Sequence, residues 1–179
     1  MNEFKFNVLL YSDGSQQAFS AAVYAANLLE NMPNMHLTVA QIHEDSVAEY
    51  AWIDTWPISP TSEWFKRAID ESDTSTQIQY NEILSKTTEV FSERALDISH
   101  HVIHSNSSIA DTVDALLNYA TKNPFKLIIM GTRGLTTLKG LIFGCLAHNV
   151  LNNSPIPVLL VKKLPQDFID RYCSNIKSK

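Results

Sequence analysis

The chain has 179 residues, of which 45% are hydrophobic and 18% are charged, and its formal net charge is −5. This length supports one hydrophobic core, so we expect a single domain over 1–164 that is followed by a polar tail over 165–179. The acidic balance argues against nucleic acid and anionic lipid as partners, and no apolar run is long enough to span a membrane or to act as a signal peptide.

Apolar runs with strand character alternate with helical patterns along the chain. The first run ends at the turn Ser12-Asp13-Gly14-Ser15, after which apolar residues recur at helical spacing until Pro33 stops the helix. The alternation predicts five strands, at 6–11, 36–43, 96–104, 126–130 and 158–161. It predicts helices over 16–32, 77–95, 106–123 and 141–152. Asn106 or Ser107 is expected to cap the third of these helices.

Residues 44–76 interrupt this alternation and are interpreted as an insertion. Eight acidic side chains lie within 44–75, against only Lys66 and Arg67. The stretch also contains all three tryptophans, Trp52, Trp56 and Trp64. These rings either stack on a ligand or pin the insertion to the domain, and we favour pinning.

Strands that alternate with helices of this length predict a parallel sheet, because each parallel connection has to cross the sheet. The expected fold is therefore α/β and doubly wound, with helices on both faces. Ligands of such sheets bind outside the carboxyl ends of the strands, where the strand order reverses. The Asp13 turn and the loop after 126–130 would then face one crevice.

Four of the five glycines fall within fourteen residues, directly behind the apolar run 127–130: Gly131, Gly134, Gly140 and Gly144. Glycines at the end of a buried strand permit a close backbone approach to a ligand. The helix predicted over 141–152 follows, and the free N–H groups of its first turn point back towards the loop. Strand, loop and helix start together predict an anion site, most naturally one for phosphate.

These residues resemble the universal stress protein family of the UspA domain type over nearly the whole chain. The family's nucleotide motif is Gly, two residues, Gly, nine residues, and then Gly followed by Ser or Thr. Gly131, Gly134 and Gly144 keep that spacing, with Cys145 in the place of Ser or Thr. The segments Asp13-Gly14-Ser15 and 155–161 resemble other signatures of the family.

The resemblance implies a Rossmann-like sheet of five parallel strands in the order 3-2-1-4-5. In many members an adenine nucleotide binds in the crevice of this sheet. By position, Asp13 would contact the ribose or the adenine, and the backbone of Ile42 would meet the adenine edge.

By the same resemblance, Gly131 and Gly134 would let the loop close on ribose and phosphate, and the N–H groups at the start of the last helix would hold the phosphates. The implied ligand is ATP, ADP or AMP, with or without Mg²⁺. The residues expected to bind it are Asp13, Ile42, Met130, Gly131, Arg133, Gly134, Gly144, Cys145 and Leu146.

The leading hypothesis is thus a nucleotide-binding switch or sensor of the stress response, with at most a slow ATP hydrolase activity. A homodimer through the fifth strand, Val158–Val161, is implied by the resemblance. The alternative is a nucleotide-free dimeric interaction module of the UspA type. The cysteines, Cys145 and Cys173, form no disulfide framework, which fits a cytoplasmic protein.

Several residues allow a second interpretation. Asp13 either contacts the ligand or caps the first helix. Cys145 is either a redox-sensitive thiol or a tolerated small residue. His100 and His104 would lie about 13 Å apart on a strand, too far to share one metal ion, so no metal site is expected. No catalytic motif stands out, and no catalytic residue is assigned.

Overall fold

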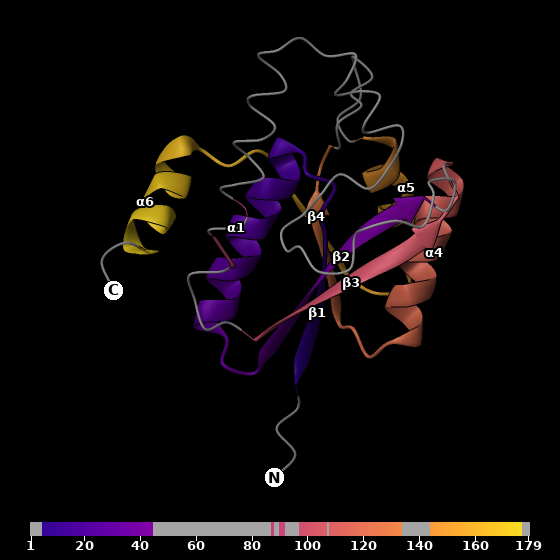
Figure 1. Ribbon diagram of the computed structural model, residues 1–179, viewed down its shortest axis with the longest axis horizontal. Coiled ribbons are helices and arrows are strands. Elements are labelled where there is room, and N and C mark those ends of the chain that lie inside the picture. The colour runs from indigo at the N-terminus through magenta and orange to yellow at the C-terminus, as the bar shows by residue number, and fades with distance from the viewer. Residues whose placement is uncertain are drawn as a thin grey trace, which may run out of the picture.

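Five parallel strands form the central sheet of the protein in a computed structural model (Figure 1). The structure describes residues 5–44, 87, 90–91, 97–106, 108–133 and 144–176. The strand order is β3-β2-β1-β4-β5, and every pairing is parallel. The strands are β1 Phe6–Tyr11, β2 Met35–Glu44, β3 Ile98–Ser105, β4 Leu127–Gly131 and β5 Val158–Val161. The predicted fold class and strand order are confirmed.

The centre of the sheet is covered on both faces, which explains the continuous apolar runs in its strands. Val8, Leu9 and Leu10 of β1 are fully buried, and so are Ile128 and Ile129 of β4. β1 pairs with β2 on one side and with β4 on the other, so it lies where the chain changes its direction of winding. This switch point is where ligands of such sheets bind.

Helices α1 (Gln16–Asn31) and α6 (Gln166–Ile176) cover one face of the sheet. Helices α4 (Ile109–Lys122) and α5 (Cys145–Asn153) cover the other face, as the two sides of Figure 1 show. Each face has its own cluster of buried side chains, one built on α1 and one on α4 and α5. Helices on both faces are as predicted.

The start of α4 differs from the prediction. Its N-cap is Ser108, in place of Asn106 or Ser107, because Ser108 has extended backbone angles and its Oγ accepts the N–H of Asp111 at 3.0 Å. The last predicted helix begins at Cys145, with Gly144 as its N-cap, and residues 141–143 lie outside the described part of the chain.

The predicted polar tail, 165–179, contains helix α6. Ile169 and Tyr172 of this helix are buried in the cluster on the α1 side. The backbone N–H of Leu164 donates to Oγ of the buried Ser20 at 3.1 Å, which fixes the approach of the chain to α6. The tail is therefore part of the folded domain.

The predicted insertion at 44–76 and its three tryptophans lie outside the described residues, apart from Glu44 at the end of β2. Of the helix predicted over 77–95, Thr87, Val90 and Phe91 are described, and all three are helical and buried. Within the described part of the chain, no helix has the length and apolar character needed to cross a bilayer.

Candidate functional site

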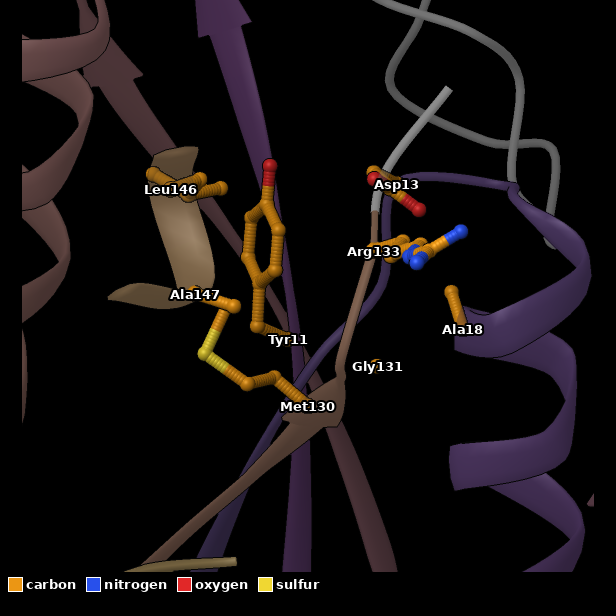
Figure 2. Close-up of a pocket in the computed structure, with 8 residues that line it drawn as sticks. All are labelled: Tyr11, Asp13, Ala18, Met130, Gly131, Arg133, Leu146 and Ala147. Atoms are coloured by element: carbon orange, nitrogen blue, oxygen red, sulfur yellow. The ribbon is translucent and has the colours of Figure 1, made fainter. Parts of the chain in front are cut away.

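A pocket lies at the carboxyl ends of β1 and β4, at the switch point of the sheet (Figure 2). The cavity itself measures about 10 Å³, room for about one water molecule, and it is open to solvent. Helix α1 contributes to one side and the first turn of α5 to the other. The lining residues are Tyr11, Asp13, Ala18, Met130, Gly131, Arg133, Leu146 and Ala147.

The turn between β1 and α1 is stabilised by side chains of its own. Oδ1 of Asp13 accepts the backbone N–H of Ser15 at 2.9 Å, and Gly14 has a φ of 77°, which only glycine adopts without strain. Ser15 then caps α1, because its Oγ accepts the N–H of Ala18 at 3.1 Å. Asp13 therefore shapes the turn and does not cap the helix.

The carboxyl group of Asp13 lies in a partly buried position beside the pocket. Burial raises the pKa of Asp13 above its ordinary value of 3.8, and the hydrogen bonds from Ser15 partly offset this rise. Figure 2 shows that Asp13 and Arg133 lie on the same side of the pocket. Among the described lining residues, Asp13 is acidic and Arg133 is basic.

Gly131 is needed because β4 ends directly against α1. A Cβ atom at Gly131 would lie 2.8 Å from the carbonyl carbon of Gln17 and 2.9 Å from the backbone nitrogen of Ala18. The space that a side chain would take is thus filled by the first turn of α1. This packing explains the glycine without a ligand.

Two hydrogen bonds hold the ends of the loop that connects β4 to α5. Oγ of Ser15 donates to the carbonyl oxygen of Arg133 at 3.3 Å, which ties the second residue after β4 to the start of α1. The N–H of Gly144 donates to the carbonyl oxygen of Thr132 at 2.8 Å. Both ends of the glycine-containing loop are therefore held beside the pocket.

The first turn of α5 presents backbone donors. Gly144 is the N-cap and has no side chain to accept from the helix. No described residue accepts a hydrogen bond from the N–H groups of Cys145, Leu146 or Ala147. Such a helix start carries a partial positive charge and binds anions.

Most of the expected binding residues meet in this pocket. Those that line it are Asp13, Met130, Gly131, Arg133 and Leu146. Gly144 and Cys145 lie directly before Leu146 at the start of α5 but do not line the pocket. Gly134 lies outside the described residues.

Ile42 does not line the described pocket. Its side chain is 8% exposed and packs in the cluster on the α4 side of the sheet, and the expected contact of its backbone with the adenine edge stays a prediction. Three lining residues were not expected from the sequence, namely Tyr11, Ala18 and Ala147. The signal for Tyr11 is its place as the last residue of β1, because the ligand crevice of such sheets lies at the carboxyl ends of the strands.

His101 of the edge strand β3 packs against helix α4. The ring of His101 stacks on Tyr119 of α4, with 4.1 Å between the ring centroids and 8° between the planes. The rings of Tyr119 and Phe125 also lie side by side, with 5.6 Å between their centroids. In the ranges that the structure describes, no three His, Cys, Asp or Glu side chains are grouped so as to hold a metal ion.

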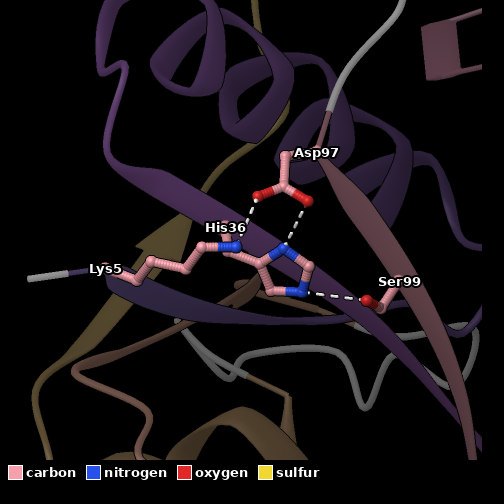
Figure 3. Close-up of polar contacts among 4 residues, drawn as sticks. All are labelled: Lys5, His36, Asp97 and Ser99. Atoms are coloured by element: carbon pink, nitrogen blue, oxygen red, sulfur yellow. Dashed lines mark hydrogen bonds and ion pairs between the residues drawn. The ribbon is translucent and has the colours of Figure 1, made fainter. Parts of the chain in front are cut away.

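A second polar cluster lies at the amino ends of β2 and β3 (Figure 3). Nδ1 of His36 lies 2.8 Å from Oδ1 of Asp97, and its Nε2 lies 2.8 Å from Oγ of Ser99. Nζ of Lys5 lies 3.3 Å from Oδ2 of Asp97. The cluster joins the residue before β1 to the starts of β2 and β3.

The order Asp97, His36, Ser99 is that of a serine hydrolase triad, but the surroundings favour a structural role. Hydrolysis needs donors that stabilise an oxyanion. The contacts of His36, Asp97 and Lys5 join the residue before β1 to the starts of β2 and β3. None of these residues lines the described pocket.

Asp97 is expected to add a small, pH-dependent part of the stability. The hydrogen bond from His36 first, and then the charges of His36 and Lys5, hold the pKa of Asp97 below its ordinary value of 3.8. Asp97 therefore contributes its full stabilisation of the folded state at a pH above its pKa in the unfolded chain. This contribution is lost as the pH falls through its lower pKa in the folded protein. Because the Asp97 side chain is 54% exposed, Asp97→Asn should lower the free energy of unfolding at pH 7 by only about 0.2–1 kcal/mol.

Urea unfolding of the wild type and Asp97→Asn at pH 7, 5, 4 and 3 measures this contribution. The difference between the two proteins should shrink as the pH falls from 5 to 3. A difference that does not change over this range contradicts the proposed ion pairs.

Comparison with known proteins agrees with this geometry. The sequence model of the universal stress protein family matches residues 6–162. A universal stress protein from Methanocaldococcus jannaschii is 24% identical over 156 residues, which covers 87% of this chain and 81% of the relative. The solved structure of UspA from Lactobacillus plantarum is similar with a TM-score of 0.53 and 16% identity, over 88% of this chain and 98% of that one.

Another universal stress protein, solved in complex with cAMP, is similar with a TM-score of 0.51 and 20% identity. The likeness covers 89% of this chain and 98% of that protein. The family match runs from the start of β1 to just past the end of β5, and α6 lies beyond it. This chain belongs to the universal stress protein family.

Proposed function

We propose that this protein binds an adenine nucleotide, ATP, ADP or AMP, in the pocket between β1 and β4. In this role it is a cytoplasmic switch or sensor of the stress response, in which nucleotide occupancy changes the contacts between protein chains. The observation that carries the proposal is the first turn of α5. Its three N–H groups without a described acceptor lie beside a pocket lined by Arg133, at the switch point of the sheet.

The related structure with cAMP supports an adenine nucleotide as the ligand class. That protein shares the fold of this chain, and cAMP combines an adenine base, a ribose and a phosphate. A phosphate suits the N–H groups of Cys145, Leu146 and Ala147, and Asp13 stands at the pocket wall as an acceptor for ribose or base donors.

The protein contacts that respond to the nucleotide would be those of a homodimer through β5. In the described sheet β5 is the last strand, paired with β4, so its outer edge is available for pairing with a second copy. Val158, Leu159 and Leu160 of this strand are only partly buried in the single chain.

Isothermal titration calorimetry with ATP, ADP and AMP, each with and without Mg²⁺, tests the nucleotide. Binding of at least one of the three is expected, and analytical ultracentrifugation should show that the bound nucleotide changes the dimer dissociation constant. The absence of heat at millimolar concentration of every nucleotide would defeat the proposal.

A nucleotide-free dimeric interaction module is the second candidate function. It is favoured by the small size of the cavity, about 10 Å³, whose wall includes the ring of the buried Tyr11 (Figure 2). This function predicts a dimer whose dissociation constant is the same with and without nucleotide. The same ultracentrifugation series therefore separates the two candidates.

A further inference from the structure

Helix α1 is buried on all sides over its first half. The six consecutive residues 18–23 are each at most 5% exposed. Successive residues of an α-helix point about 100° apart, so six of them cover its whole circumference. The sheet covers the inner side, where Gly131 of β4 lies directly against the backbone of Gln17 and Ala18. Another part of the chain therefore has to cover the outer side.

Helix α6 supplies part of this outer cover. Ile169 and Tyr172 of α6 are buried in the same cluster as Phe19 and Val23 of α1. Figure 1 shows α6 beside α1, on the side that faces away from the sheet. The match to the family model ends at residue 162, so α6 lies beyond the matched region.

Hydrogen bonds connect the segment that leads into α6 with both ends of the glycine-containing loop. The N–H of Thr132 donates to the carbonyl oxygen of Val161, the last residue of β5, at 2.9 Å. The carbonyl oxygen of Thr132 accepts the N–H of Gly144, the N-cap of α5, at 2.8 Å. Three residues after Val161, the N–H of Leu164 donates to Oγ of Ser20 on α1 at 3.1 Å.

The first turn of α1 belongs to the same set of contacts. Ala18 lines the pocket, and its N–H donates to Oγ of Ser15. The same Oγ donates to the carbonyl oxygen of Arg133, another lining residue. Ser20, which holds Leu164, lies only two residues further along α1. A displacement of α1 at Ser20 would therefore reach Ala18 and, through Ser15, the backbone of Arg133.

Helix α6 is held to the domain by one face. The apolar side chains of that face are Phe168, Ile169, Tyr172 and Cys173, and the neighbours Asp170 and Arg171 are exposed. Segments near a chain end open locally at a lower free energy than the whole domain. Because α6 contributes no strand, its undocking would leave the five-stranded sheet in place.

We propose that α6 regulates the candidate pocket. Docked α6 holds α1, Thr132 and the start of α5 in the arrangement that binds a ligand, and a nucleotide in the pocket strengthens the docking of α6. The second effect follows from the first, because coupling between two sites is reciprocal. This inference rests on the proposed nucleotide function and adds its regulation: the position of α6 reports whether the pocket is occupied.

Amide hydrogen exchange of the full chain without ligand, followed by NMR, tests the coupling first. The proteins are the wild type, Tyr172→Ala, which removes a buried ring of α6, and Arg171→Ala, the matched control on the exposed side of the same helix. Tyr172→Ala should speed exchange at the amides of Thr132 and Gly144 by about fivefold or more. Arg171→Ala should leave both at the wild-type rates.

A reference amide separates this effect from a general loss of stability. The N–H of Leu37 donates to the carbonyl oxygen of Asp97 at 3.1 Å, on the β2–β3 side of the sheet. Its exchange should change less in Tyr172→Ala than that of Thr132 and Gly144. Equal acceleration of all three amides, or unchanged rates at Thr132 and Gly144, overturns the coupling.

Calorimetry with AMP and with ATP on the same three proteins tests the regulation. Tyr172→Ala should weaken the tighter of the two nucleotides by about fivefold or more, and Arg171→Ala should bind it like the wild type. By reciprocity, saturating nucleotide should slow amide exchange within α6 of the wild type by a similar factor. A purely structural α6 would not respond to the ligand in this way.

The outcomes separate the two proposals. Equal affinity in all three proteins, or exchange within α6 that nucleotide does not change, overturns the regulation and leaves nucleotide binding in place. The absence of binding by the wild type overturns both. Circular dichroism confirms the fold of each variant, and Ile169→Val, a smaller change on the same face of α6, replaces Tyr172→Ala if that variant does not fold.

Discussion

Gly131→Ala should lower the free energy of unfolding by about 3 kcal/mol, the upper end of the range for overpacked sites. The added Cβ would lie 2.8 Å from the carbonyl carbon of Gln17 and 2.9 Å from the nitrogen of Ala18. Both atoms belong to helix backbone, which cannot rotate away as a flexible side chain can. Either α1 or the end of β4 has to move, and both are packed against the core.

Urea unfolding followed by circular dichroism measures this effect. With an m-value of about 2 kcal/mol/M, the midpoint should fall by roughly 1–2 M. Gly144→Ser is the matched control, because Gly144 has a φ of −66° and a ψ of 155°, which a serine N-cap adopts readily. Its stability should change by only a few tenths of a kcal/mol. A midpoint for Gly131→Ala equal to that of the control contradicts the close approach of β4 to α1.

Ser15→Ala should cost about 2 kcal/mol and should also weaken nucleotide binding. Ser15 is 3% exposed, and its Oγ both accepts the N–H of Ala18 and donates to the carbonyl oxygen of Arg133. Loss of a helix cap costs about 0.5–2 kcal/mol, and buried groups left without partners add to that. The substitution also removes the hydrogen bond that holds the backbone of Arg133 beside the pocket.

Ser108→Ala separates the general effect of a lost cap from this specific one. Ser108 caps α4 through the N–H of Asp111 at 3.0 Å, but it is exposed and does not line the pocket. Its loss should cost about 1 kcal/mol and leave nucleotide affinity unchanged. The account of Ser15 is wrong if both variants lose equal stability and bind nucleotide equally well.

The fold was largely predictable because its signals are local. The continuous apolar runs of β1 and β4 mark strands buried on both faces, and both were placed within one residue of their observed bounds. The alternation of strands with helices predicted the parallel sheet. The strand order itself came from the family resemblance, since spacing along the chain does not determine which strands become neighbours.

Helix α6 shows where the composition of a segment misled. The segment after Pro165 is rich in polar residues, which suggested a tail. Yet Phe168, Ile169, Tyr172 and Cys173 recur at helical spacing, and all four pack on the α1 side of the sheet. The periodicity was a better indicator than the mean polarity.

The glycine spacing predicted a site behind β4, and a pocket lies there, but its role in binding a nucleotide stays a prediction. The close contact of Gly131 with α1, which accounts for this glycine without a ligand, has no local signal in the sequence. Contacts between residues far apart in sequence, such as Ser15 with Arg133, depend on the tertiary packing and leave no local pattern. The sequence predicts Tyr11 only as the last residue of a strand, whereas in the structure it also lines the pocket.

The most direct test of the nucleotide site compares AMP with adenosine in ¹H–¹⁵N correlation spectra of the wild-type protein. If the start of α5 holds the phosphate, AMP should shift the amide resonances of Cys145, Leu146 and Ala147, and adenosine should shift them far less. Equal shifts from both ligands, or AMP shifts confined to residues outside the β1–β4 crevice, would contradict phosphate binding at this helix.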